Sequence, residues 1–319
     1  MKDAPLIETI DLRTYFKVKG GTLHAVDGVN LSIMSGETLG VVGESGCGKS
    51  TLGRSILRLT EPTSGKILYR GEDITKKNGR EMKLLHQKMN IIFQDPLSSL
   101  NPRMTVRELI ADPIRVNHLY QHKSEIYPKV QHLMDMVGLS RRVEDSYAHE
   151  LDGGRRQRIG IAKALALSPE FIVCDEPVSA LDVSIQAQVL NLLMDLQDEM
   201  KLTYLFITHD LSVVRHISKN IMVMYMGCCI EYAPTDELFE RPLHPYTKAL
   251  LDAIPIPDME HIGKEPNILH GEVASPINPP EACRFAPRCI HACERCRTAC
   301  PSMKEVSPGH FVACTLVTE

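Results

Sequence analysis

The sequence lacks any long apolar run. No stretch approaches the roughly 18 consecutive apolar residues that a transmembrane helix needs, and the opening residues Met1 to Pro5 do not form a signal peptide. Lysine and arginine form no dense basic stripe and the net charge is −4, which argues against nucleic acid as the main ligand. Internal repeats and low-complexity blocks are also missing. We therefore expect a globular cytoplasmic protein whose membrane role, if it has one, comes through a partner.

The composition is otherwise that of an ordinary folded protein, with 43% apolar and 24% charged residues. Its 319 residues suffice for one large α/β domain with a small appendage, or for two modest domains. The ten cysteines are unevenly distributed, because six of them lie between Cys283 and Cys314. In a reducing cytoplasm this crowding suggests a metal site before it suggests disulfides.

A glycine-rich loop follows an apolar strand between Leu39 and Thr51 and fits the pattern G-x-x-x-x-G-K-[ST]. In such a loop the backbone N–H groups surround a phosphate, Lys49 reaches the outer phosphates and Ser50 can ligate Mg²⁺. The alternative is a glycine-rich turn without a ligand. We predict a nucleoside triphosphate site formed by Gly43, Glu44, Ser45, Gly46, Cys47, Gly48, Lys49, Ser50 and Thr51.

The remaining elements alternate between strands and helices, which predicts a parallel sheet with helices on its faces. An antiparallel β layer is expected over residues 7–33, turning at Gly20 and Gly21, and continuing over 64–73. Further strands are expected at 38–42, 89–93, 171–174, 203–207 and 221–226. Helices are expected at 52–59, 106–137 with breaks at Pro113 and Pro128, 155–167, 183–200 and 246–253.

Two acids, Asp175 and Glu176, follow the buried strand 171–174. Hydrolysis of a phosphoanhydride needs Mg²⁺ to neutralise charge and a carboxylate to orient or deprotonate the attacking water. The alternative is a pair of solvated acids at the start of a loop. Gln94 and His209 also follow predicted strands. Polar residues are common at strand ends, so each of these residues indicates a catalytic site only in combination with the phosphate loop and the two acids.

The order of these features resembles the ATP-binding subunits of ABC transporters over about residues 5–255. It runs from the phosphate loop through Gln94, residues 151–154, Asp175-Glu176 and residues 179–182 to His209. The resemblance implies a P-loop ABC-type ATPase fold with an antiparallel β subdomain and a helical subdomain. The implied domains are an ATPase domain over 1–255, with the helical subdomain at about 100–168, and a Pro-rich and Cys-rich extension over 256–319.

The same resemblance implies a role for each residue of the site. ATP and Mg²⁺ are the implied ligands, Glu176 is the base, His209 holds the γ-phosphate, and Asp182 lies in the loop after the acids. Phe16 is preferred over Tyr15 as the aromatic residue that stacks on adenine. The implied Mg²⁺ ligands are Ser50, Gln94 and Asp175, and Gln94 also faces the membrane partner.

Several longer segments look like the oligopeptide and dipeptide importer ATPases, namely residues 41–47, 93–96, 99–104 and 242–247, and residues 275–280 fit the F-type subunit of that family. The resemblance implies ATP-driven peptide import at the cytoplasmic face of the membrane. The implied partners are a second ATPase subunit, two membrane permeases and an extracytoplasmic solute-binding protein. The alternatives are import of nickel or another small solute, a soluble ABC-type ATPase outside transport, and a nucleotide-dependent regulatory module.

The sequence departs from the family signature Leu-Ser-Gly-Gly-Gln, where it has Leu151-Asp152-Gly153-Gly154-Arg155. In the family this loop binds the γ-phosphate held by the other subunit of a dimer. An ionised Asp152 cannot donate a hydrogen bond, and its repulsion of a phosphate at about 4 Å amounts to about 4 kcal/mol at an effective dielectric constant near 20. We therefore expect a heterodimer in which the site containing Asp152 is impaired. The alternative is that Asp152 caps a helix and both sites work.

Four cysteines near the C-terminus resemble the [4Fe-4S] motif of these importer ATPases. Four thiolates suit either an iron-sulfur cluster or Zn²⁺, and a tail without metal is a further alternative. Cys293 and Cys300 are surplus to this pattern. The implied ligands are Cys283, Cys289, Cys296 and Cys314.

Overall fold

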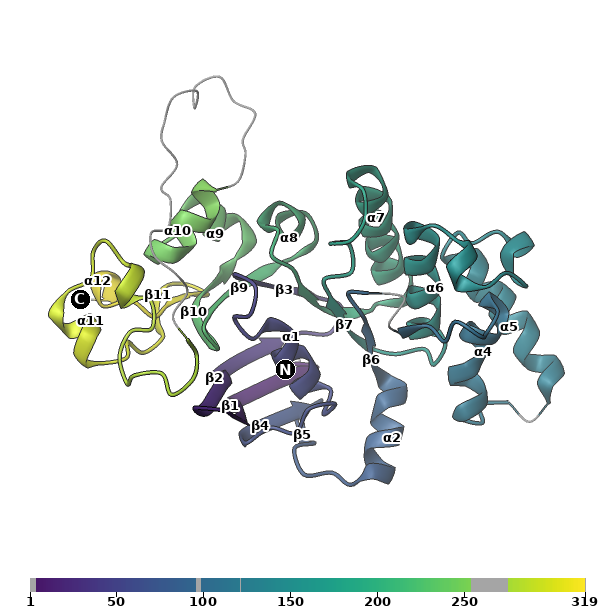
Figure 1. Ribbon diagram of the computed structural model, residues 1–319, viewed down its shortest axis with the longest axis horizontal. Coiled ribbons are helices and arrows are strands. Elements are labelled where there is room, and N and C mark those ends of the chain that lie inside the picture. The colour runs from purple at the N-terminus through teal and green to yellow at the C-terminus, as the bar shows by residue number, and fades with distance from the viewer. Residues whose placement is uncertain (1–3, 96–98, 121, 254–274, 319) are drawn as a thin grey trace, which may run out of the picture. The chain divides into compact units, whose positions relative to one another are not determined.

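The computed structural model describes residues 4–95, 99–120, 122–253 and 275–318 (Figure 1). The chain forms two compact units, each described here by itself. The first unit comprises residues 1–34, 38–76 and 206–319, and the second comprises residues 35–37 and 77–205. The predicted domain boundary near Ile256 falls outside the described residues.

The first unit contains the expected antiparallel β layer, a sheet in the order β2-β1-β4-β5 (Figure 1). The hairpin prediction is confirmed, because Val18 pairs with Gly21 across a turn at Gly20. Alternate residues of β1 and β2 are buried, as expected for a sheet with one face in the core. The strands are β1 (Ile7–Val18), β2 (Gly21–Ile33), β4 (Ser64–Tyr69) and β5 (Glu72–Asp73).

The first unit also contains strands in the order β11-β12-β10-β9-β3. The predicted strand at 38–42 is confirmed as β3, which is buried throughout and pairs in parallel with β9. The strands are β3 (Thr38–Val42), β9 (Asn220–Tyr225), β10 (Cys228–Pro234), β11 (Lys304–Ser307) and β12 (His310–Val312). The helices of this unit are α1 (Lys49–Ile56), α8 (Leu211–Ile217), α9 (Thr235–Glu240), α10 (Pro245–Asp252), α11 (Glu294–Thr298) and α12 (Thr315–Thr318), with a short turn η4 (Ala286–Arg288).

An aromatic cluster joins the C-terminal residues to the core of the first unit. Phe285 is 3% exposed and packs edge-on against Tyr225 and Tyr246, with ring centroids 5.3 and 5.5 Å away. Burying a Phe side chain contributes about 2 kcal/mol of stability. The C-terminal segment is therefore packed into the same core as β9 and α10 rather than lying free of it.

The second unit is built on a parallel pair of strands covered by helices. The predicted strands are confirmed as β6 (Met89–Ile92) and β7 (Phe171–Asp175), which pair in parallel. The next strand is β8 (Thr203–Ile207), and the boundary between the two units falls within it. The helices are α2 (Gly79–Lys88), α4 (Val106–Val116), α5 (Lys123–Met136), α6 (Gly153–Leu165) and α7 (Val183–Met200), with short turns η1 (Arg141–Val143) and η2 (Ala148–Glu150).

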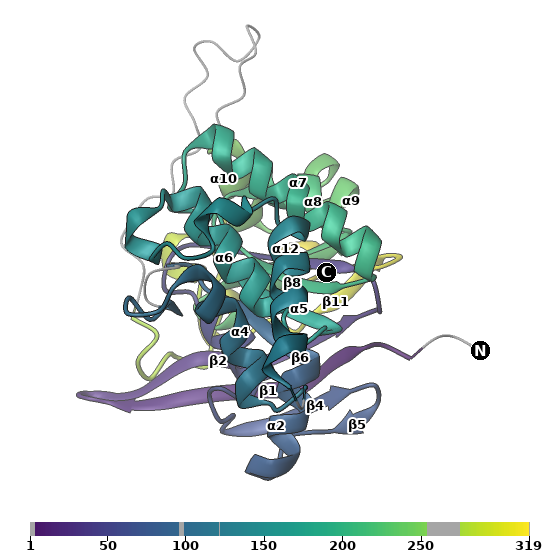
Figure 2. The same cartoon turned by 90° about the vertical axis from the view of Figure 1, so that its right-hand side faces the viewer.

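The helical insertion differs from the sequence expectation in its break points. Pro113 lies inside α4 and Pro128 lies inside α5, so the prediction that these prolines interrupt the helices is wrong. The break instead follows α4, where the Asn117 side chain donates to the carbonyl of Pro113 at 2.9 Å and His118 adopts a positive φ of 52°. A polar side chain that satisfies the last carbonyls ends a helix without a proline. Figure 2 shows α4, α5 and α6 packed side by side.

None of the described helices is both long and apolar enough to cross a membrane.

Candidate functional site

The predicted phosphate loop lies between β3 and α1 and depends on two glycines. At Gly43, with φ of 151°, a Cβ atom would lie 2.2 Å from the carbonyl oxygen of Met224. At Gly48, with φ of 105°, it would lie 2.0 Å from the carbonyl oxygen of Ala25. Both positions therefore exclude any side chain, which explains why the pattern requires glycine there.

Lys49 is the buried cation of this loop, with 5% exposure. Its ammonium group donates to the carbonyl oxygens of Gly43 at 2.7 Å and Glu44 at 3.0 Å. The loop thus curls around the lysine, and the Gly227 N–H group fixes its far side by donating to the carbonyl of Cys47 at 2.8 Å. The first turn of α1 follows directly, so the N–H groups of a helix start and a lysine come together, as an anion site requires.

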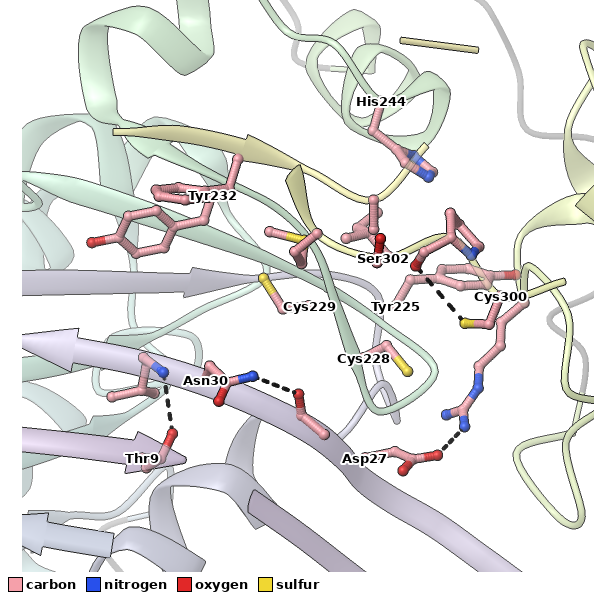
Figure 3. Close-up of a pocket in the computed structure, with 18 of the residues that line it drawn as sticks. Thr9, Asp27, Asn30, Tyr225, Cys228, Cys229, Tyr232, His244, Cys300 and Ser302 are labelled. Atoms are coloured by element: carbon pink, nitrogen blue, oxygen red, sulfur yellow. Dashed lines mark hydrogen bonds and ion pairs between the residues drawn. The ribbon is translucent and has the colours of Figure 1, made fainter. Parts of the chain in front are cut away.

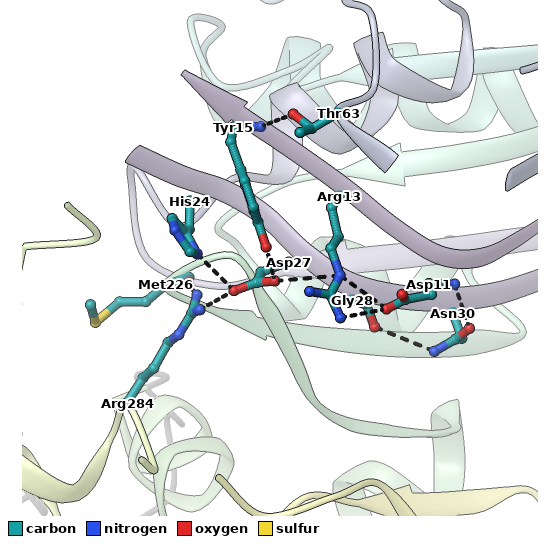
Figure 4. A network of polar contacts seen from close by, with 10 residues as sticks. All are labelled: Asp11, Arg13, Tyr15, His24, Asp27, Gly28, Asn30, Thr63, Met226 and Arg284. Carbon is teal, nitrogen blue, oxygen red and sulfur yellow. Dashed lines mark hydrogen bonds and ion pairs between the residues drawn. The ribbon is translucent and has the colours of Figure 1, made fainter. Parts of the chain in front are cut away.

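The predicted adenine-binding aromatics lie on β1, and their surroundings differ. The Tyr15 ring stacks on His24 at a centroid distance of 4.0 Å, and its hydroxyl donates to Asp27 at 2.5 Å (Figure 4). Burial and the bond to Asp27 raise the pKa of Tyr15 to about 12. Phe16, the preferred residue, is 38% exposed.

Asp27 is the centre of a polar network that the sequence analysis missed (Figure 4). It accepts from Tyr15, lies 3.0 Å from Nδ1 of His24 and forms an ion pair with Arg284. Burial by itself would raise the pKa of Asp27, but the bonds with Tyr15 and His24 and the charge of Arg284 lower it below its usual value. No local pattern marks this aspartate, because its arginine lies 257 residues further along the chain.

In the second unit the structure brings two predicted catalytic residues together. The Gln94 side chain donates from Nε2 to Oε2 of Glu176 at 2.9 Å. Glu176 has a positive φ of 48°, and both the N–H group and the hydroxyl of Ser179 donate to its carbonyl oxygen. A left-handed non-glycine residue is uncommon, and these two bonds from Ser179 hold the backbone of Glu176 in that conformation. Asp175, at the end of β7, is 2% exposed.

The signature-like loop places Asp152 at the N-terminus of α6. Its carboxylate accepts from the Arg155 N–H group at 2.8 Å and lies 3.3 Å from the Arg155 guanidinium. Asp152 therefore is a helix cap, as the alternative interpretation of this residue expected. A Cβ atom on Gly153 would lie 3.2 Å from Leu181, and one on Gly154 would lie 2.7 Å from Ile185, so the glycines let this loop pack against the start of α7.

The other two predicted site residues are exposed at element starts. Asp182 is the residue before α7, and its carbonyl accepts from Gln186 at 2.8 Å. His209 follows β8, and hydrogen bonds hold its neighbours Thr208 and Asp210. The Thr208 N–H group donates to Val41 at 3.1 Å, and the Asp210 side chain caps α8 by accepting from Ser212 at 2.8 Å.

The four predicted metal-binding cysteines gather in the first unit. The Cys283 N–H group donates to the carbonyl of Cys296 at 2.9 Å, and burial together with the nearby thiols of Cys296 and Cys314 raises the pKa of Cys283 to about 11. Cys289 lies within the electrostatic reach of Cys296 as well. The surplus Cys293 is 3.4 Å from Cys296 between sulfur atoms. Within the described part of the chain, however, no three His, Cys, Asp or Glu side chains are already arranged to hold a metal ion.

A cavity of about 760 Å³ lies in the first unit beside these residues (Figure 3). Its walls come from β1, β2, β10 and the C-terminal segment, and they include Asp27, Arg284, Cys228 and Cys300. The described residues that line it include none from the phosphate loop. This cavity could not be predicted from the sequence, because it is formed by segments far apart in the chain.

Two family models match the chain. Residues 26–179 match the model described as ABC transporter, and residues 230–296 match the model described as oligopeptide/dipeptide transporter, C-terminal region. The second match covers Cys283, Cys289 and Cys296.

Curated relatives match over nearly the whole chain. The putative oligopeptide transport ATP-binding protein YkfD of Bacillus subtilis is 52% identical, with 99% of this chain and 97% of the relative covered. The oligopeptide transport ATP-binding protein OppF of Salmonella typhimurium is 49% identical, with 98% and 96% covered. Among solved structures, the ATP-binding cassette MJ0796, bound to ADP and phosphate in a dimeric post-hydrolysis state, matches with a TM-score of 0.66 and 27% identity, over 72% of this chain and 98% of that one.

Proposed function

Because the chain belongs to the ATP-binding subunits of ABC transporters, in their oligopeptide transport branch, we propose that it hydrolyses ATP to drive the import of peptides. The observation that carries the hydrolytic part is the 2.9 Å bond between Gln94 and Glu176. It joins a side chain suited to Mg²⁺ with a carboxylate suited to activating water. The peptide part rests on relatives named for oligopeptide transport that match almost end to end.

In this proposal each residue has a distinct task toward ATP. Lys49 and the N–H groups of the loop bind the phosphates. Glu176 orients or deprotonates the attacking water, and Gln94 holds the Glu176 carboxylate in place through its hydrogen bond. His209 would contact the γ-phosphate. Ser50, Gln94 and Asp175 would hold Mg²⁺, which when bound would supply positive charge to neutralise the phosphates. Hydroxyl, amide and carboxylate oxygens are the ligands that Mg²⁺ prefers, so these side chains fit the ion.

We assign adenine stacking to Phe16. Its neighbour Tyr15 already stacks on His24 and donates its hydroxyl to Asp27, whereas Phe16 is 38% exposed. An exposed aromatic face is what a purine base needs.

The partners follow from the same family. We propose a heterodimer with a second ATPase subunit, bound to two permeases at the cytoplasmic face of the membrane and supplied by an extracytoplasmic solute-binding protein. Asp152 supports the asymmetric form of this dimer, because an acid in the signature loop adds negative charge where the partner's γ-phosphate binds. The pairing of Asp152 with Arg155 offsets part of that charge.

The cysteine cluster is proposed as a [4Fe-4S] site, with Zn²⁺ as the alternative. The fit lies in the donor set, because Cys283, Cys289, Cys296 and Cys314 gather in one place and thiolates suit both metals. Burial raises the pKa of Cys283, Cys289 and Cys314, whereas hydrogen bonds with Thr315 and Cys293 lower the pKa of Cys296. When bound, a metal would supply structural support to a segment with few apolar residues.

The peptide function is tested by isolating the tagged full chain from its native membrane. We expect permeases and a solute-binding protein to copurify, and we expect peptide-loaded binding protein to stimulate ATP hydrolysis after reconstitution in vesicles. Stimulation by Ni²⁺ and not by peptides would favour the nickel alternative. Purification with no membrane subunit would favour an ABC-type ATPase outside transport.

A further inference from the structure

The C-terminal segment that begins at Ser275 contacts the predicted adenine-binding hairpin within the first unit. The His24 N–H group donates to the carbonyl of Pro276 at 3.0 Å, and Thr22 and Asn278 exchange two bonds of 2.9 Å each. Ile277 forms a β-bridge with Leu23, which itself pairs with Phe16. The segment thus lies antiparallel along the outer edge of β2, so the hairpin tip is held from outside the hairpin.

Arg284 makes the second contact with the nucleotide-binding side of this unit. Its side chain is 10% exposed, and it donates to the carboxylate of Asp27 and to the carbonyl of Met226 (Figure 4). Asp27 in turn bonds Tyr15 and His24. This arginine therefore fixes the same hairpin through its strand β2.

Arg288 makes the third contact, on the phosphate loop itself. Its guanidinium donates two hydrogen bonds to Glu44, at 2.8 and 3.0 Å, and is 6% exposed. The backbone N–H group of Glu44 donates to the hydroxyl of Tyr246 at 2.9 Å, and the Arg288 guanidinium lies 5.9 Å from the ring of Tyr225. Both the backbone and the side chain of Glu44 are thus held by residues from outside the loop.

We propose that the segment from Cys283 to Cys289 is an integral part of the ATP site, in which Arg288 is a positioning residue that fixes the phosphate loop through Glu44. This inference rests on the proposed assignment of residues 43–51 to the phosphates of ATP. Two parallel hydrogen bonds to one carboxylate restrict its orientation far more than a single bond does. Arg288 also compensates a negative charge that would otherwise lie in a loop built to bind a polyphosphate.

The position of these arginines links the nucleotide site to the cysteine cluster. Arg284 follows Cys283 and Arg288 precedes Cys289, so both arginines lie on the loop between two predicted metal ligands. Any change that displaces the loop moves the groups that hold the phosphate loop and the hairpin. In this proposal the extension acts on ATP binding through Arg288, which holds the phosphate loop, and Arg284, which holds the hairpin.

The test is a double-mutant cycle on the full chain, with the Kd for a fluorescent ATP analogue as the readout. We expect Arg288→Met and Glu44→Gln each to raise the Kd about tenfold, and the double variant to show no further loss, because both changes remove one shared interaction. Arg288→Lys, which keeps the charge but cannot form two parallel bonds, is expected to recover only part of the affinity. Arg297→Met, at an exposed position of α11, is the matched control and is expected to bind like the wild type.

Three results would overturn the proposal. The first is wild-type ATP affinity in Arg288→Met. The second is a double variant in which the increases in Kd of the two single variants multiply. The third is a double variant with wild-type affinity, which would show that Arg288 only compensates the charge of Glu44. Lys49→Ala separates this inference from the assignment on which it rests. Unchanged affinity in Lys49→Ala would contradict the phosphate-loop assignment itself, whereas loss there with no effect of Arg288→Met would reject the positioning role alone.

Discussion

At the scale of single residues, Glu176 is the proposed catalytic base. Its positive φ of 48° and its bond from Gln94 fix the carboxylate at the end of β7. We expect Glu176→Gln to lower ATP hydrolysis by the assembled transporter by a factor of about 100 or more, since that is the usual contribution of a general base. ATP binding should persist, because the phosphate loop is unchanged.

The measurement for this prediction is the steady-state release of phosphate, together with the Kd for ATP. Glu170→Gln is a suitable control. Glu170 precedes β7, at the opposite end of this strand from Glu176, and forms an ion pair with Lys88. Hydrolysis near the wild-type rate in Glu176→Gln would remove Glu176 from the catalytic role.

At the scale of elements, α6 makes it possible to change the charge of the signature loop without losing the helix cap. Serine and aspartate are both good N-caps, so Asp152→Ser should leave the stability of α6 nearly unchanged while it removes the negative charge. If the site containing Asp152 is impaired, we expect up to about a twofold rise in ATP turnover of the heterodimer, as the second site begins to contribute. Phosphate release at saturating ATP measures this, and an unchanged rate would indicate that Asp152 does not limit its site.

The start of α10 gives a pH-dependent prediction. His244 is buried and neutral, accepts from the Tyr246 N–H group at 3.0 Å, and burial lowers its pKa to about 4. Because the unfolded chain binds a proton at this histidine near pH 6.5 and the folded chain does not, the stability from this group is complete above about pH 6.5 and falls as the pH drops toward 4. The loss at pH 5 is about 2 kcal/mol.

Denaturant unfolding of the wild type and of His244→Asn at pH 7 and pH 5 measures this contribution. Asparagine can still cap the helix but does not titrate, so the variant should lose less stability between the two pH values. An equal loss in both proteins would show that His244 does not contribute.

At the scale of the whole molecule, the sequence predicted elements where a strong local pattern and its end signals agree. The predicted helix at 183–200 and the predicted strand at 203–207 have the bounds of α7 and β8. Pro113 and Pro128 misled the prediction, because a proline removes one donor but does not end a helix whose apolar face is well packed. The residues of the phosphate loop and the acids after β7 could be predicted for the same reason as α7, because each motif is contiguous in the sequence.

The contacts that complete the site were not predictable in this way. Glu44 and Arg288 lie 244 residues apart, and Asp27 and Arg284 lie 257 residues apart. No periodicity or motif relates such positions in a single sequence. Their pairing follows from the packing of Phe285 against Tyr225 and Tyr246, which positions the loop from Cys283 to Cys289.

The proposed metal ligands Cys283 and Cys289 flank the loop that carries Arg284 and Arg288. We expect the full chain, purified without oxygen, to contain iron and acid-labile sulfide and to absorb visible light. Cys289→Ser and Cys296→Ser should lose both, whereas the exposed Cys300→Ser should retain them. Because the loop would then be held less firmly, the two ligand variants should also bind ATP more weakly, by a factor approaching that of Arg288→Met. Zinc in place of iron would change the metal but not this coupling, and full ATP affinity in a metal-free Cys289→Ser protein would show that packing of Phe285 alone suffices to hold the loop.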